Sequence, residues 1–111
     1  MRSQLPEWWP ALPAIAVAAL ALAACGSPPP TTQLNRAQTA ILGAQQDGAQ
    51  QLASTQLQSA QDKLSSAQAS VAQKKMERAK DLAEESEMTA HLADQLALAQ
   101  KAENMQKAIN Q

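Results

Sequence analysis

Residues 57–71 read LQSAQDKLSSAQASV, and this stretch decides the fold expected for the chain. Its apolar residues recur at alternating spacings of three and four: Leu57, Ala60, Leu64, Ala67 and Val71. That spacing places them along one side of an α-helix and is the heptad pattern of helices that pack side by side. The triplet Ser-Ala-Gln occurs at 59–61 and again at 66–68, so the polar residues follow the same period. The stretch therefore predicts a helix that packs against another helix.

A second segment with the same pattern lies upstream. Its apolar side is formed by Leu34, Ala37, Ile41, Ala44 and Gly48. Thr31 and Thr32 follow the last proline of the chain and are a residue type that caps helix N-termini. We therefore expect this helix to begin at Thr31 or Thr32 and to end near Gly48, because glycine commonly terminates helices.

The second half of the chain predicts one or two further helices. Thr55 and Gln58 have the spacing of a capping box, so the heptad helix is expected to begin at this point. Lys74 and Lys75 suit a helix C-terminus, and Glu77 suits the first turn of a new helix. Because neither Gly nor Pro occurs in this half of the chain, one continuous helix is the alternative to a helical hairpin.

The segment after Glu77 carries a broad stripe of mostly small residues: Ala79, Leu82, Ala83, Ser86, Thr89, Ala90, Ala93, Leu96 and Ala97. Small side chains let helices approach closely. Beyond Leu98 the stripe drifts to Ala102, Met105 and Ile109, so the last turns are expected to project free. The expected fold of residues 34–111, an Ala/Gln-rich domain, is all-α: an elongated antiparallel helical hairpin or a three-helix coiled-coil-like bundle.

Residues 1–24 have the composition of a secretory leader. Arg2 supplies the positive end, and residues 11–22 supply an apolar stretch. That stretch has the length of a signal-peptide core and falls short of the roughly 20 apolar residues of a membrane span. A cleaved signal peptide is expected, and an uncleaved anchor is the alternative.

Leu22, Ala23, Ala24 and Cys25 resemble the lipobox of bacterial lipoproteins, which consists of a leucine, two small residues and a cysteine. The resemblance implies that a diacylglyceryl group is attached to the Cys25 sulfur and that the leader is cleaved between Ala24 and Cys25. Two or three fatty chains then anchor the protein to a membrane without a spanning helix. Residues 25–33 would form the lipidated cysteine and a Pro-rich tether. A plain signal peptide with an incidental cysteine is the alternative.

The residue after Cys25 bears on the destination of the protein. Among Gram-negative lipoproteins an aspartate at that position commonly retains the protein in the inner membrane. This chain has Gly26 there. The resemblance therefore implies the outer membrane, with the helical domain facing the periplasm.

Residues 57–97 also resemble family 4398 of the domains of unknown function, which occurs in bacterial lipoproteins. The positions in register with the family pattern are Leu57, Ala60, Lys63, Leu64, Ala67, Ala79, Leu82, Ala83, Ala90, Leu92 and Ala93. Met76 stands where the family usually has an aromatic residue, and Thr89 where it usually has aspartate. The resemblance implies a helical hairpin on a lipid anchor and no established activity.

No catalytic or metal site is expected. His91 is the single histidine, with Glu87 and Asp94 within one turn, and one imidazole with flexible carboxylates falls short of a zinc site. A solvated pair between His91 and Glu87 is expected instead. The chain has no phosphate-binding glycine loop, and its net charge of −1 gives no field that would attract nucleic acid. We expect a protein that is not an enzyme and has no cofactor.

The expected role is structural or one of protein interaction in the bacterial cell envelope. Trp8 and Trp9 are the only aromatic residues, so any core consists of small aliphatic side chains. Self-association or an envelope protein partner would supply the missing burial. A ligand carrier or small-molecule binding module of the envelope is the alternative function, and it would need an apolar cavity.

Overall fold

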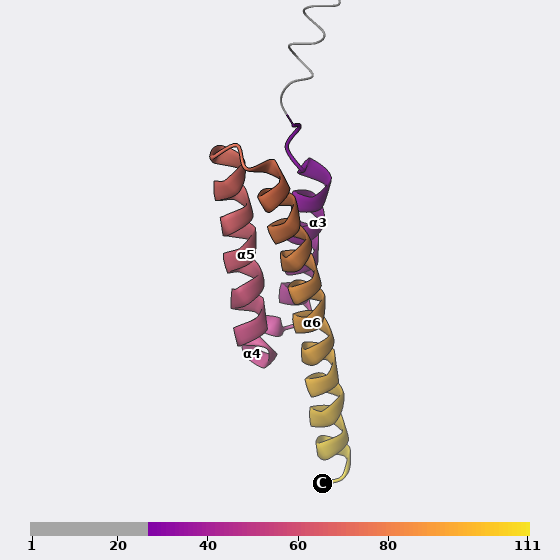
Figure 1. Cartoon of the computed structure of the whole chain (residues 1–111). Helices are drawn as coiled ribbons and strands as arrows, with labels where there is room; N and C mark the ends of the chain where they lie inside the picture. The colour runs from indigo at the N-terminus through magenta and orange to yellow at the C-terminus, as the bar shows by residue number, and fades with distance from the viewer. Residues whose placement is uncertain (1–26) are drawn as a thin grey trace, which may run out of the picture.

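The structure, a computed structural model, describes residues 27–111. Within this range all regular elements are helices: α3 (Thr31–Gln46), α4 (Ala49–Leu52), α5 (Ser54–Ala72) and α6 (Met76–Ile109). Helices α3, α5 and α6 lie side by side, and α5 runs in the opposite direction to the other two (Figure 1). The prediction of an elongated all-α fold is confirmed. Of the two predicted arrangements, a helical hairpin and a three-helix bundle, the chain forms the three-helix bundle.

Helix α3 begins at Thr31 as predicted, but the predicted cap is wrong. Pro30 occupies the N-cap position, and no side chain caps the helix. The carbonyl oxygen of Pro30 accepts a hydrogen bond from the Leu34 N–H at 3.0 Å. Because the prolines extend up to the helix, Thr31 and Thr32 lie inside its first turn. Residues 31–33, expected in the tether, are thus helical.

Gly48 ends α3 near the predicted position. Its φ is +90°, a left-handed conformation that favours glycine, and its N–H donates to the Gln45 carbonyl oxygen at 3.1 Å. An added Cβ would lie 3.3 Å from Cε of Lys101, so α6 passes close to this turn. The single turn of α4, which was not predicted, follows. Its C-cap residue is Ala53, whose φ is −147°.

Helix α5 begins at Ser54, close to the predicted start, but the capping box of Thr55 and Gln58 does not form. Ala53 is the N-cap residue, and no side chain caps the helix. Because the helix starts two residues earlier than the box requires, Thr55 lies in its first turn. The Gln58 amide instead donates to Oδ1 of Asp62 at 2.9 Å, one turn farther along.

A tight turn separates α5 from α6 and excludes the single continuous helix. Lys74 has a φ of +62°, and its N–H donates to the Val71 carbonyl oxygen at 2.9 Å. The N–H of Lys75 donates to the Ser70 carbonyl oxygen at 2.8 Å. These two bonds form a Schellman motif. The predicted end near Lys74 is confirmed, and α6 begins at Met76, one residue before the predicted start.

The core of the bundle consists almost entirely of alanine. The buried residues of the three long helices are Ala37, Ile41, Ala44, Leu57, Ala60, Ala67, Ser70, Ala79, Ala83, Ser86, Ala90, Ala93 and Ala97. Helices α5 and α6 pack so closely that Oγ of Ser86 donates to the Ala60 carbonyl oxygen at 2.7 Å. The predicted stripes are confirmed at their small residues. The larger Leu64 and Leu82 are half-buried and Leu96 is exposed, because the interfaces are too narrow for them.

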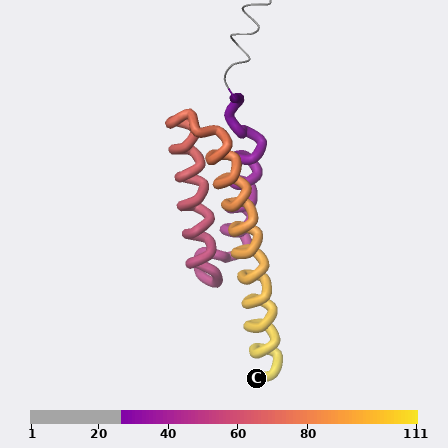
Figure 2. The backbone as a smooth tube through the Cα atoms, viewed as in Figure 1, coloured from indigo at the N-terminus to yellow at the C-terminus, as the bar shows by residue number. Residues whose placement is uncertain are grey.

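Helix α6 extends beyond the other helices (Figures 1 and 2). All residues from 101 to 111 are exposed, and we call this segment the overhang. The prediction that the last turns project free is confirmed. With its 34 residues, α6 is about 51 Å long.

Candidate interaction surfaces

The residues predicted for the lipid anchor lie outside the described part of the chain: Leu22, Ala23, Ala24 and Cys25. The structure begins at Ser27 and shows how the tether meets the helices. Among the helices of residues 27–111, none combines the length and the apolar character needed to span a membrane. The anchor stays a prediction.

The base of the tether packs against the start of α6. Pro30 is buried, and the Thr31 N–H donates to the Pro29 carbonyl oxygen at 2.9 Å. The three prolines line a small cleft together with Met76 and Lys80. The chain therefore enters the bundle at the end where α5 turns into α6 (Figure 1). The overhang lies at the opposite end.

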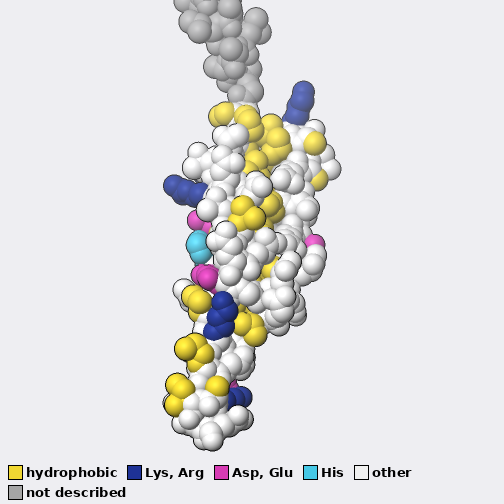
Figure 3. Space-filling view, turned by 180° about the vertical axis from the view of Figure 1, so that it is seen from behind, with side chains coloured by type: hydrophobic (Ala, Val, Ile, Leu, Met, Phe, Trp, Pro, Cys, Tyr) yellow, Lys and Arg dark blue, Asp and Glu magenta, His cyan; other side chains and the backbone are white. Residues whose placement is uncertain are grey.

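An exposed apolar stripe begins one turn before the overhang and continues along it. It is formed by Leu98, Ala102, Met105 and Ile109, at spacings of four, three and four residues, and we call it the overhang seam. Leu98 is 45 % exposed, Met105 65 % and Ile109 80 %. Hydrophobic side chains continue down the overhang beyond the other helices (Figure 3). The spacing is that of a heptad seam, here without a partner helix among residues 27–111.

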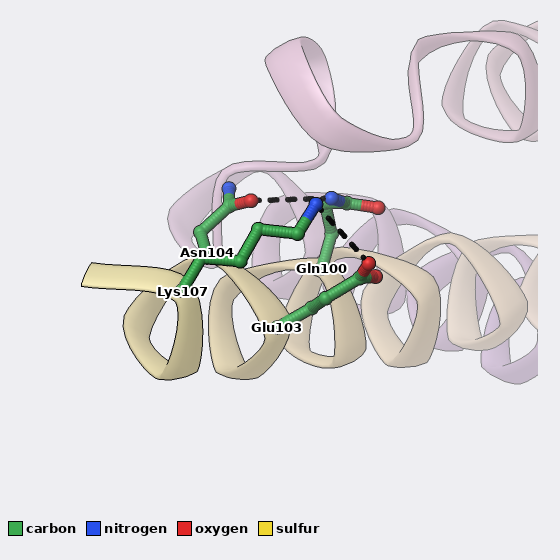
Figure 4. Close-up of polar contacts among 4 residues, drawn as sticks. All are labelled: Gln100, Glu103, Asn104 and Lys107. Atoms are coloured by element: carbon green, nitrogen blue, oxygen red, sulfur yellow. Dashed lines mark hydrogen bonds and ion pairs between the residues drawn. The ribbon is translucent and has the colours of Figure 1, made fainter. Parts of the chain in front are cut away.

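Polar side chains occupy the other side of the overhang (Figure 4). The Gln100 amide donates to Oδ1 of Asn104 at 3.3 Å, and Nζ of Lys107 lies 3.4 Å from Oε1 of Glu103. At about 100° per residue, which follows from 3.6 residues per turn, these four residues lie opposite the overhang seam. The overhang is therefore amphipathic, and its apolar side is the side suited to a protein contact.

The predicted pair of His91 and Glu87 is present. Nε2 of His91 lies 3.7 Å from Oε1 of Glu87, and the His91 side chain is 60 % exposed. Within the described residues no three His, Cys, Asp or Glu side chains lie close enough together to hold a metal ion. The pair is a solvent-exposed contact between neighbouring turns of α6 and contributes little to stability.

Sequence reasoning missed a contact between two carboxyl groups on different helices. Asp47 is the C-cap residue of α3, and Asp94 lies on α6. Oδ1 of Asp94 is shielded from solvent and faces no hydrogen-bond donor. The pKa of Asp94 is raised because its protonated form can donate a hydrogen bond to Asp47, and partial burial and the negative charge of Asp47 add to the effect. No sequence signal marks the pair, because the two residues lie far apart along the chain.

An open cleft of about 510 Å³ lies between α3 and α6. It is lined by Arg36, Thr39 and Gly43 of α3, and by Glu87 and His91 of α6. An added Cβ on Gly43 would have no neighbouring atom within 4 Å, so the cleft is empty above this residue. Ligand pockets enclose most of their ligand and are usually lined by bulky apolar and aromatic side chains, whereas this cleft is open to solvent and no Leu, Ile, Val, Met, Phe, Tyr or Trp among residues 27–111 lines it. It therefore gives a ligand-carrier function little support.

Comparison with known proteins assigns the family. The chain matches the family described as "Domain of unknown function (DUF4398)" over residues 32–109, which include nearly all of the four helices. No curated protein matches the chain. No solved structure matches it either. The chain belongs to the DUF4398 family.

Proposed function

We propose that this member of the DUF4398 family is a lipoprotein of the bacterial outer membrane that faces the periplasm and has a structural, protein-interaction role. The leader, residues 1–24, is removed, and Cys25 carries the lipid. One observation carries the proposal: the tether enters the bundle at one end, and the overhang seam is exposed at the other. The bundle then holds the seam away from the membrane.

The length of α6 sets how far from the membrane the seam lies. Leu98 is 22 residues after Met76, which places it about 33 Å along the helix from the anchor end. Ile109 lies about 50 Å along the same helix. The seam is therefore presented in the periplasm and not at the lipid surface.

The partner that fits the overhang seam is a second copy of this chain. Two copies anchored in the same membrane point the same way, so their overhangs lie parallel and at equal height. In heptad terms Leu98 falls at position d and Ile109 at position a, a combination that favours parallel two-stranded coiled coils. Lys101 at position g would face Gln106 at position e of the partner chain, so no like charges meet.

The seam by itself makes a small interface. Its four side chains bury less than the roughly 800 Å² per partner of a stable protein complex. Anchoring raises the effective concentration of the two overhangs, because both chains are confined to one membrane. We therefore expect dimers of the anchored protein and weak association of the free helical domain.

The anchor is tested by mass spectrometry of the protein purified from bacterial cells. The expected product begins at Cys25 and carries fatty chains on that residue. Cys25→Ala is expected to leave an uncleaved precursor without lipid. Cleavage at another position in the natural protein, with no added lipid, would remove the anchor from the proposal.

The interaction is tested with a cysteine in the overhang seam. Because Cys25 is the only natural cysteine and is acylated, Met105→Cys provides the one free thiol. Thiol crosslinking in membranes is expected to give dimers of this variant. Lys107→Cys, on the opposite side of the helix, is the matched control and is expected to stay monomeric. Crosslinks of Met105→Cys to other proteins alone would show that the seam binds a different envelope protein.

A further inference from the structure

We infer that the end of the bundle at which the tether enters binds the anionic headgroups of the membrane, so that the bundle stands on the lipid surface. This end consists of the α5–α6 turn and the first turns of α3 and α6, and we call it the basal end. The inference rests on the proposed function, because it requires the lipid at Cys25. It assigns a ligand class, the phosphate groups of anionic lipids, to residues that the proposed function leaves without a role.

Four cations cluster at the basal end within seven residues of sequence: Lys74, Lys75, Arg78 and Lys80. All four are exposed. The ion pairs among the described residues are His91 with Glu87 and Lys107 with Glu103. The four basal cations therefore have no carboxylate partner in the described part of the chain. Their charge is available to an anion outside the protein.

Neighbouring acids reduce this charge but do not cancel it. Glu77 lies among the four cations and Asp81 directly follows them, so these two acids offset part of the positive charge. The next acid, Glu84, lies one helical turn beyond Lys80 and offsets part of its charge. From Lys74 and Lys75 in the α5–α6 turn, Glu84 lies at least about 12 Å away along the helix. That distance exceeds the Debye length of about 8 Å at physiological ionic strength. The α5–α6 turn at the basal end therefore presents positive charge to a membrane surface that it touches.

Backbone groups at the basal end add donors for phosphate. Helices α3 and α6 both begin here (Figures 1 and 2). Neither N-terminus is capped by a side chain. Free N–H groups and the helix dipole make such ends favourable for anions. Helix α5 ends here, but its last carbonyl groups accept the Lys74 and Lys75 N–H groups in the Schellman turn. Donors therefore outnumber free acceptors at this end.

The tether is short enough to hold the basal end against the membrane. Pro30 is buried in the bundle and lies five residue steps after Cys25. At about 3.1 Å per residue, a polyproline II conformation of these five steps would span about 16 Å. Basic side chains at the same end are then within reach of the headgroup layer, where clusters of Lys and Arg bind anionic lipid.

The test measures contact between the basal end and lipid headgroups in the lipoprotein purified from cells. Gln73→Cys places a fluorophore on an exposed residue beside the cations without removing a charge. The protein is reconstituted into vesicles that contain nitroxide-labelled headgroups, with either neutral or anionic lipid. We expect quenching to be stronger in anionic vesicles, on the order of twofold, and to fall to the neutral level at high salt. The same label at Asn110→Cys, at the far end of α6, should show little quenching in either.

A matched pair of variants tests the charges. Lys74→Gln with Lys75→Gln is expected to abolish the difference between anionic and neutral vesicles. Lys101→Gln with Lys107→Gln removes the same charge from the far end and should leave the difference unchanged. Equal quenching in neutral and anionic vesicles would overturn the inference while leaving the anchor intact. A protein without lipid on Cys25, seen by mass spectrometry and by failure to float with vesicles, would instead refute the proposed function.

Discussion

Lys74 carries backbone strain in the α5–α6 turn. Its φ of +62° is in the left-handed region, at a helix end where glycine is preferred. Lys74→Gly should therefore raise the free energy of unfolding by about 1 kcal/mol. Thermal or urea unfolding measures the change. Lys75→Gly, where φ is −97°, is the control and should give no gain; an equal gain there would argue against strain at Lys74.

The Asp47–Asp94 contact makes stability depend on pH. The folded-state pKa of Asp94 lies above its unfolded value of 3.8, so the folded state binds its proton more tightly. The resulting stabilisation is fully present below pH 3.8 and is lost as the pH rises through the folded-state pKa.

At neutral pH the two carboxylates repel each other. Asp94→Asn should therefore stabilise the protein there by about 0.5 kcal/mol, a small effect because solvent screens the pair. The gain over the natural protein should shrink as the pH falls. Unfolding curves at several pH values measure this, with Asp81→Asn on the exposed side of α6 as the matched control. A gain independent of pH would contradict the assignment.

Helix starts were easier to predict at the residue scale than the groups that cap them. Thr31 and Thr55 lie at or next to real helix starts, and the last proline and the capping-box spacing located them. Neither side chain caps, because Pro30 and Ala53 take the N-cap positions. The competition between adjacent residues for one cap position depends on backbone angles that the residue types alone do not fix.

At the scale of the helices, the alanine core makes the size of a side chain more important for stability than its hydrophobicity. Ala90 is fully buried between helices, whereas Leu92 is 50 % exposed. Ala90→Leu adds apolar atoms but overpacks the interface, so it should destabilise the fold by about 1–3 kcal/mol. Leu92→Ala removes apolar atoms from the surface and should cost about 0.5 kcal/mol or less. Chemical unfolding measures both, and a larger loss for Leu92→Ala would contradict the packing described for α6.

The heptad spacing predicted which positions of each helix are buried, and it did so best for alanine. It did not decide between a hairpin and one long helix. The left-handed residue that ends α5 is Lys74, and a glycine there would have marked the turn in the sequence. It also did not reveal α4, whose single turn is too short to show a period. The Asp47–Asp94 contact depends on the relative rotation of α3 and α6, which only packing determines.

For the whole molecule, the number of long helices decides where the C-terminus lies. A hairpin on a lipid anchor, as the family resemblance implied, would return the C-terminus toward the membrane. With α3 as a third long helix, the chain enters at the basal end and leaves at the opposite end (Figure 1). The overhang therefore points away from the proposed anchor, and the basal cations lie beside it. Both proposals depend on this arrangement.

Removal of the overhang should separate folding from association. A chain that ends after Gln100 lacks only residues that are exposed, so its free energy of unfolding should stay within about 0.5 kcal/mol of the natural protein. It also lacks three of the four seam residues. Thiol crosslinking at Leu98→Cys, which both chains retain, should give dimers of the full-length protein and not of the shortened one. Dimers of equal yield from both would show that the chains associate through the bundle, and the overhang would then need another role.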